Sequence, residues 1–313
     1  MIATTIDTHL KERIKALGKF VGNTPLFPLQ NVVEKPDVKI YAKLEWQQFG
    51  GSVKARPAYN IIKSAIYSGE LTEGKHILDA SSGNTAIAYA AIGAAINVPV
   101  TICLPKNASE ERKQILKSFG AHIHLTSPFG TTDEAQQIAQ SLFEEQPHKY
   151  FYANQYGNDN NWKAHYNGTA EEIFRQTDGS ITHFVTGLGT TGSFTGTGRK
   201  LKEIKPDIHL TSLQPDAALH GLEGWKHLET AILPGIYDDT IADQNLEIDT
   251  YEALDTLKRV ANTEGLLISP SSAANLTGAL KVANTIDEGV IVTLFPDNAE
   301  KYGEVIKNLF GDA

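Results

Sequence analysis

Apolar and polar positions follow two different periods that alternate along most of the chain. Short apolar runs, such as residues 38–44, 76–80 and 99–104, are bounded by turn residues and predict buried strands. Between them, residues 110–119 carry apolar positions every three or four residues, which predicts a helix, and the almost entirely apolar residues 84–97, rich in Ala and Gly, predict a buried helix. Because strand and helix follow one another in turn, we expect a mostly parallel sheet covered by helices, the arrangement of an α/β fold.

The same alternation extends over the rest of the sequence, with a pause at the polar residues 154–161. Further strands are expected over residues 122–125, 150–153, 181–186, 208–213, 266–268 and 290–295, and further helices over residues 7–20, 58–66, 133–145, 251–262, 273–283 and from about 302. The pause suits a domain junction. We predict two α/β domains, each with a mostly parallel sheet covered by helices. A smaller, mobile domain takes residues 40–155, and a larger domain takes residues 1–39 and 156–313. Ligands of such proteins usually bind in a cleft, which we expect between the domains.

Composition and charge narrow the class of protein. The 313 residues include 28 Lys and Arg against 37 Asp and Glu, a net charge of −9, and no basic run with interleaved aromatic residues. Nucleic acid is therefore not an expected partner, and an anionic substrate would need a local cationic pocket. The single cysteine, Cys103, lies in an apolar run and is expected to be buried and structural, which fits a reducing cytosol. No secretory signal is visible, and residues 86–96 are too short an apolar segment to cross a membrane, so we expect a cytoplasmic protein without a membrane partner.

Lys54 lies in the segment that joins the strand over residues 38–44 to the next helix. The paired glycines Gly50 and Gly51 precede it and allow the backbone to approach a ligand closely. The first turn of a helix disfavours a cation, so a lysine placed there can have a lowered pKa. Such a lysine can act as the nucleophilic amine that forms Schiff bases with carbonyl cofactors. A solvated lysine in a loop fits this stretch about equally well.

A second polar stretch joins the strand over residues 76–80 to its helix, and consists of Ser81, Ser82, Gly83, Asn84 and Thr85. Two hydroxyl groups, a glycine and an amide at the start of a helix present N–H groups to an anion such as a carboxylate. A polar turn that only caps the helix is the simpler interpretation of this stretch by itself.

A third stretch follows the strand over residues 181–186, where Gly187, Gly189 and Gly192 match the phosphate-binding pattern G-x-G-x-x-G. A dinucleotide site would also need an acidic residue at the end of the next strand, and only Asp216 is near. The hydroxyl residues of the loop, which suit a compact monophosphate, are Thr190, Thr191 and Ser193. A purely structural glycine turn remains an alternative.

Other polar residues give weaker signals by themselves. Ser271 lies in a serine-rich turn that could be an ordinary helix cap. The ten histidines form no set with the spacing of metal ligands, so no metal is expected. Asp79 and Asp297 end strands and need no catalytic role. Residues 215–239 have no clear period, and a loop of that length is usually functional or mobile.

Together, and in this order, the stretches resemble the cysteine synthase and cystathionine β-synthase family of fold-type II pyridoxal-phosphate enzymes, whose fold is that of the tryptophan synthase β subunit. The similarity covers nearly the whole chain and is strongest to the branch of cysteine synthase B and O-phosphoserine sulfhydrylase. It includes the opening signature over residues 21–26, the lysine motif over residues 51–54 and the loop over residues 82–85. It also includes the phosphate loop over residues 189–193 and the serine at position 271.

The resemblance implies roles for individual residues. Lys54 would hold pyridoxal 5′-phosphate covalently and act as the catalytic base. The other cofactor-binding residues would be Asn84, Gly189, Thr190, Thr191, Gly192, Ser193 and Ser271, the last facing the pyridine nitrogen. The substrate-binding residues would be Ser81, Ser82, Gly83, Thr85, Gln155 and Lys226, the last at a position where O-phosphoserine sulfhydrylases carry an arginine that meets the substrate phosphate. The chain departs from the family pattern at Ala55, Ala86 and Ala273, and residues 296–302 lack the family's glycine before the acidic residue.

The activity that the resemblance implies is a transferase of cysteine and amino-acid biosynthesis that works as a homodimer. It would make L-cysteine from an activated serine, O-acetylserine or O-phosphoserine, and sulfide or another sulfur donor, by way of an aminoacrylate. Alternatives on the same site are condensation of the cystathionine β-synthase kind, a replacement that forms diaminopropionate, and dehydration of serine or threonine. Alternatives without this cofactor are a nicotinamide oxidoreductase and an inactive binding module.

Overall fold

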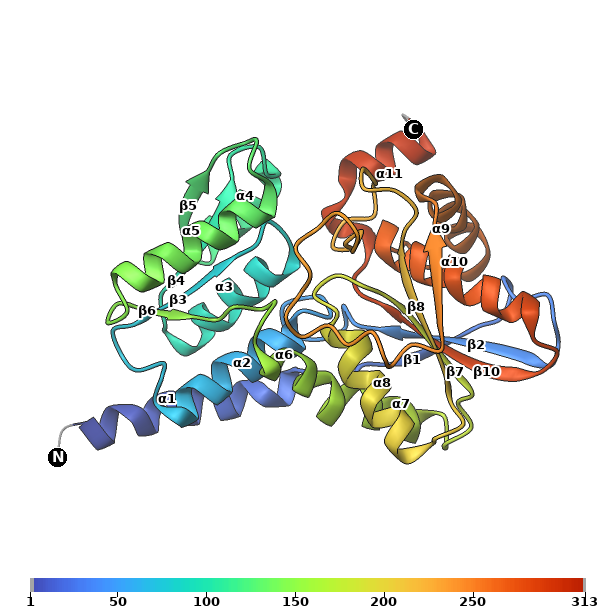
Figure 1. Ribbon diagram of the computed structural model, residues 1–313, viewed down its shortest axis with the longest axis horizontal. Coiled ribbons are helices and arrows are strands. Elements are labelled where there is room, and N and C mark those ends of the chain that lie inside the picture. The colour runs from blue at the N-terminus through green and yellow to red at the C-terminus, as the bar shows by residue number, and fades with distance from the viewer. Residues whose placement is uncertain (1–2, 312–313) are drawn as a thin grey trace. The chain divides into compact units, whose positions relative to one another are not determined.

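The computed structural model describes residues 3–311, and the chain divides into two compact units (Figure 1). Unit 1 contains residues 1–22 and 48–161, and unit 2 contains residues 23–47 and 162–313. Each unit is built around one sheet with helices on both faces, so the expected α/β class with mostly parallel sheets is confirmed.

Unit 1 has a four-stranded parallel sheet in the order β5-β4-β3-β6. Its strands are β3 (His76–Ala80), β4 (Val100–Pro105), β5 (His122–Thr126) and β6 (Tyr150–Tyr152). Its helices are α1 (Ala3–Leu17), α2 (Ala55–Ser68), α3 (Asn84–Ile96), α4 (Glu110–Ser118) and α5 (Thr131–Glu145). The side chains of β3 alternate between the two faces of the sheet, and each face has its own core. Ile77 packs with α2 and α3 on one face, and Leu78 packs with α5 on the other. Cys103 is buried in the second core, as expected for a structural cysteine.

Unit 2 has a six-stranded sheet in the order β1-β2-β10-β7-β8-β9, parallel except for the β1–β2 pair. Its strands are β1 (Leu26–Leu29), β2 (Val38–Leu44), β7 (His183–Gly187), β8 (His209–Pro215), β9 (Gln244–Ile248) and β10 (Gly289–Phe295). Helices α9 (Thr250–Glu264) and α10 (Pro270–Thr285) pack on one face. Helices α7 (Ala170–Gln176) and α8 (Gly192–Ile204) pack on the other, and α11 (Gly303–Phe310) closes the described chain.

The units differ from the predicted domain bounds at two segments. Strand β2, placed by sequence at the start of the smaller domain, pairs along its length with β10 and belongs to unit 2. Helix α1, placed in the larger domain, packs on α2 and α3 in unit 1. The polar residues 154–161 end unit 1, and α6 (Asp159–Ala164) is followed by a π-helical turn, His165–Thr169.

Three elements differ from the expected pattern. Residues 266–268 form no strand, because only Ile268 makes a single bridge, to Asn298. Strand β1 contains Pro28, which can be accommodated on the sheet edge that β1 forms. Strand β9 is largely polar and lies at the opposite edge, so neither edge strand shows a continuous apolar run. Within the described residues, no helix is long and apolar enough to cross a membrane.

Candidate active site

Lys54 is the N-cap residue of α2 and is half-buried. The chain reaches it through Gly50 and Gly51, whose φ angles of 83° and 64° fall in the left-handed region that favours glycine. The Lys54 N–H donates to the buried Ser52 Oγ at 3.3 Å, and its carbonyl accepts from the Ala58 N–H at 3.1 Å. The backbone of Lys54 is therefore fixed at the positive end of a helix, just before the first turn in which the sequence placed it.

The second predicted stretch forms the turn from β3 into α3. The Ser81 Oγ accepts from the Gly83 N–H at 3.2 Å, and a Cβ at Gly83 would meet no atom within 4 Å. The Thr85 hydroxyl donates to the Gln155 Oε1 at 2.7 Å. Gln155, predicted on the substrate side from a distant part of the sequence, is thus brought directly against this loop, and both side chains are buried.

The phosphate-like loop leads from β7 into α8, and Thr191 is its most unusual residue. Its φ of 69° lies in the left-handed region, which a β-branched side chain rarely adopts. The hydroxyl groups of Thr191 and of Thr195, one turn into the helix, are fully buried and have no hydrogen-bond partner among the described residues. Backbone strain and unsatisfied buried hydroxyls together at a helix N-terminus indicate a site for an anion.

A neighbouring segment explains two of the glycines in this loop. A Cβ at Gly187 would lie 2.0 Å from the Trp225 ring, and a Cβ at Gly189 would lie 2.1 Å from the Gly224 carbonyl oxygen. The Lys226 N–H donates to the Leu188 carbonyl at 2.8 Å. The backbone of Lys226 is therefore bonded to the loop, and Gly187 and Gly189 also serve close packing.

Ser271 lies in the first turn of α10 and belongs to a group of buried hydroxyls. The Ser269 Oγ is 3.2 Å from the Ser271 Oγ and donates to the Ser272 Oγ at 3.0 Å. The Ser272 hydroxyl in turn donates to the Asp297 carbonyl at 2.8 Å. Since each serine has one hydroxyl proton and those of Ser269 and Ser272 are already used, the Ser271 hydroxyl is the donor in its contact with Ser269. Donation to another acceptor would replace this contact.

Sequence reasoning missed several residues that hold these loops. Asn275, fully buried on α10, accepts the Gly187 N–H at 2.6 Å through its Oδ1 and donates to the Leu294 carbonyl at 2.7 Å. In the sequence, the one feature that could have indicated this role is the amide side chain of Asn275 among mostly small and apolar residues of the helix. The three departures from the family pattern, Ala55, Ala86 and Ala273, are completely buried and fill packed positions.

The predicted residues fall into two groups, one in each unit. Unit 1 contains Lys54, Ser81, Ser82, Gly83, Asn84, Thr85 and Gln155, and unit 2 contains Gly189, Thr190, Thr191, Gly192, Ser193, Lys226 and Ser271. No cluster of three or more potential metal ligands occurs among residues 3–311.

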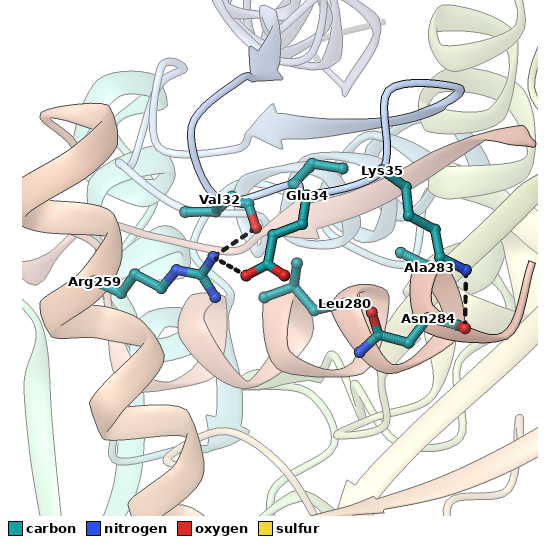
Figure 2. A pocket seen from close by; sticks show the side chains of 8 residues that line it. Val32, Glu34, Lys35, Arg259, Leu280, Ala283 and Asn284 are labelled. Atoms are coloured by element: carbon teal, nitrogen blue, oxygen red, sulfur yellow. Dashed lines mark hydrogen bonds and ion pairs between the residues drawn. The ribbon is translucent and has the colours of Figure 1, made fainter. Parts of the chain in front are cut away.

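A separate hollow in unit 2 involves none of the predicted residues (Figure 2). Arg259 donates to the Val32 carbonyl at 3.0 Å and to Glu34 at 3.3 Å, and the Lys35 Nζ donates to the Asn284 carbonyl at 3.0 Å. Its charged groups are thus bonded to one another or to the backbone. Its volume of about 90 Å³ is well below the roughly 300 Å³ at which ligand pockets begin. It is not a cofactor site.

Comparisons with known proteins agree with the predicted family. The family described as "Pyridoxal-phosphate dependent enzyme" matches residues 17–297. A cysteine synthase of Aquifex aeolicus is 45% identical over 95% of this chain and 93% of its own length. The crystal structure of O-acetylserine sulfhydrylase isoform 3 from Entamoeba histolytica superposes with a TM-score of 0.86 at 32% identity, covering 94% of this chain and 95% of that chain.

A third relative differs in its reaction. The crystal structure of an O-acetylserine-dependent cystathionine β-synthase from Helicobacter pylori superposes with a TM-score of 0.85 at 30% identity, covering 91% of this chain and 96% of that chain. The shared length, fold and motifs make this protein a pyridoxal-phosphate-dependent enzyme that forms cysteine. The chain belongs to the cysteine synthase family of fold-type II pyridoxal-phosphate enzymes.

Proposed function

We propose that Lys54 binds the aldehyde carbon of pyridoxal phosphate, that Asn84 and Ser271 bind its ring, and that the loop over residues 189–193 binds its phosphate. Thr191 is the observation that carries this assignment, because its strained backbone and unpartnered buried hydroxyl are accounted for by a phosphate at the N-terminus of α8. The Thr195 hydroxyl adds a second buried donor of the same kind. The residues present therefore fit the cofactor.

When bound, the cofactor supplies the electron sink that makes the substrate Cα acidic. The residues of the chain orient the substrate and move its protons. The N–H groups of the loop over residues 81–85 would bind the substrate carboxylate, and the Lys54 amine would remove the Cα proton and return it to Cα after the new bond at Cβ has formed. Lys54 is thus the catalytic base as well as the attachment point.

Ser271 determines how strong the electron sink is. Its hydroxyl proton is donated to Ser269 within the serine group. When the ring is bound, the same hydroxyl would turn to donate to a pyridine nitrogen that carries no proton. A neutral hydroxyl at this position stabilises a carbanion less than a carboxylate would, and this favours rapid loss of the leaving group from Cβ over side reactions at Cα.

The reaction is a β-replacement on an activated serine. The bond between Cβ and the side-chain oxygen breaks, acetate or phosphate leaves with the electron pair, and a thiolate forms a new C–S bond at Cβ. Sulfide as donor gives L-cysteine. The similarity to the Helicobacter pylori enzyme makes homocysteine the second candidate nucleophile, with cystathionine as product.

O-acetylserine is the leading substrate, and O-phosphoserine is nearly as well supported. The purified holoenzyme is expected to release cysteine from O-acetylserine and sulfide, whereas serine, with its poor leaving group, should give little. Cysteine is measured with a thiol-specific amino-acid assay, and homocysteine in place of sulfide tests cystathionine formation. Absence of both products from either activated serine would contradict the proposal.

Lys226 tests whether the leaving group is a phosphate. Its backbone is bonded to Leu188 beside the loop, and a lysine there would meet a dianionic leaving group as a point charge. If it does, Lys226→Ala should raise the KM for O-phosphoserine by a factor on the order of ten or more, because a charge-assisted hydrogen bond is lost. The KM for O-acetylserine should stay nearly unchanged. Equal effects on both substrates would remove Lys226 from the substrate site.

We further propose a cytoplasmic homodimer. A single cysteine cannot form an internal disulfide, which fits a reducing compartment. Burial raises the pKa of the Cys103 thiol to about 12 and keeps it unreactive. Light scattering of the holoenzyme is expected to give twice the chain mass of 34.1 kDa. A mass equal to one chain at micromolar concentration would contradict the dimer.

A further inference from the structure

Asp79 is a completely buried carboxyl group next to the loop that we assign to the substrate carboxylate. It lies on β3, two residues before Ser81. Its Oδ1 accepts the Ala80 N–H at 2.8 Å, and its Oδ2 accepts the Gln155 N–H at 3.1 Å. One side chain thus ties together the carboxyl ends of the neighbouring parallel strands β3 and β6.

Gln155 extends these contacts to the loop. Its side-chain Nε2 donates to the Ala80 carbonyl at 3.1 Å, and its Oε1 accepts the Thr85 hydroxyl at 2.7 Å. The Asn161 side chain also donates to the Gln155 carbonyl at 2.6 Å. Asp79, Ala80 and Gln155 therefore form a closed ring of hydrogen bonds, and Thr85, at the start of α3, is held by that ring.

Among residues 3–311, none of the groups that shift the pKa of Asp79 is a cation. The titratable groups that face it, from every neighbouring element, are Tyr89 on α3, Cys103 on β4, Tyr152 on β6 and Tyr156 in the turn that follows, with Asp133 on α5 facing Tyr156. Burial raises the pKa of Asp79 from 3.8 to about 7, while the N–H groups of Ala80 and Gln155 lower it by less. Near neutral pH, a small change in local charge can therefore change its protonation.

We propose that Asp79 is a positioning residue that holds Gln155 and Thr85 in the geometry that accepts the substrate carboxylate, and that it takes up a proton from solvent when that carboxylate binds. This inference rests on the proposed role of the loop over residues 81–85. A carboxylate bound there brings a second negative charge to the same hydrogen-bonded ring. Because like charges disfavour each other in a buried site, binding of the anion favours the neutral form of Asp79.

The coupling has a definite direction. An anion that raises the pKa of Asp79 must, by reciprocity, bind more tightly when Asp79 is protonated. The affinity for a carboxylate is therefore expected to be highest below pH 7 and to fall as the pH rises through the pKa of about 7. A neutral ligand of the same shape should show no such dependence.

The test uses the holoenzyme with acetate as a minimal carboxylate, and acetamide as its neutral counterpart. Titration calorimetry at pH 7.5, in two buffers with different ionisation enthalpies, gives the protons taken up on binding. If acetate raises the pKa by about one, the parent protein should take up about half a proton per acetate. From pH 6 to pH 8.5 the dissociation constant should rise by a factor approaching ten.

Variants of the protein test whether Asp79 is the group that takes up the proton when acetate binds. Asp79→Asn cannot titrate and should bind acetate without proton uptake and with a flat pH dependence. Asp133→Asn removes a nearby carboxylate that is not part of the ring, and should behave as the parent. Asp79→Glu keeps a titrating carboxyl and should keep the proton uptake, which preserves the test if Asp79→Asn does not fold.

The outcomes separate this inference from the proposed function. A parent protein that makes cysteine and binds acetate without taking up a proton would overturn the role of Asp79 alone. Uptake that is unchanged in Asp79→Asn would do the same. A parent protein that neither makes cysteine nor binds acetate would instead overturn the proposed function, and the inference with it.

Discussion

Replacement of Lys54 by alanine is expected to reduce cysteine formation by a factor on the order of 10³ or more, because the variant loses both the attachment of the cofactor and the base that removes the Cα proton. The fold should survive. Lys54 is a half-buried N-cap residue, and its side chain makes no contribution to either of the cores of unit 1. Initial rates with O-acetylserine and sulfide, beside thermal unfolding of the cofactor-free forms, measure the two effects separately.

Lys63→Ala is the matched control, since Lys63 is an exposed lysine on the same helix. It should leave the rate unchanged within a factor of about two, as expected for a surface substitution. If Lys54→Ala keeps a rate similar to that of Lys63→Ala, another group does the chemistry that we assign to Lys54.

Replacement of Gly189 by alanine is expected to weaken cofactor binding by at least about tenfold and to lower the stability by about 1–3 kcal/mol. The added Cβ would lie 2.1 Å from the Gly224 carbonyl oxygen, so the loop or the segment over residues 224–226 must move. Either movement displaces the N–H groups that we assign to the phosphate. Fluorescence titration of the apoprotein with pyridoxal phosphate gives the affinity, and thermal unfolding gives the stability.

Gly303→Ala provides the comparison for this effect. Its Cβ would meet no atom within 4 Å, so the same chemical change should alter neither the cofactor affinity nor the stability appreciably. A Gly189→Ala protein with normal affinity would show that the loop does not hold the phosphate, whereas a loss of stability alone would report only the packing against Gly224.

The alternation of strands and helices was predictable because buried parallel strands appear as continuous apolar runs. Residues 76–80, for example, are β3 with the predicted bounds. The edge strands β1 and β9 were missed, because edge strands contain proline or polar residues that resemble loops. The apolar residues 266–268 were wrongly predicted as a strand. Ile268 is buried by packing and Leu266 is partly buried, whereas Leu267 is exposed, and none of them belongs to a sheet ladder.

The sequence suggests a candidate site where a local motif is distinctive, as at Lys54 and the loop over residues 189–193. What the sequence did not reveal are groups that act through another residue. Asn275 reaches Gly187 across 88 positions, and Asp79 reaches Gln155 across 76. A buried aspartate at the end of a strand looks the same in a sequence whether or not its neighbour binds a substrate. Trp225 and Gly224 pack so closely against Gly187 and Gly189 that a side chain at either glycine would clash. These contacts join distant segments, so the sequence alone did not reveal them either.

The attachment of the cofactor to Lys54 is the central claim, and its most direct test is chemical. The holoenzyme is reduced with borohydride, which fixes the cofactor to the amine that holds it, and is then digested and examined by peptide mass spectrometry. We expect one modified peptide, which contains Lys54, and loss of cysteine formation in proportion to the modification. A cofactor fixed to any other lysine, or a protein that forms cysteine at the full rate after reduction, would contradict the account.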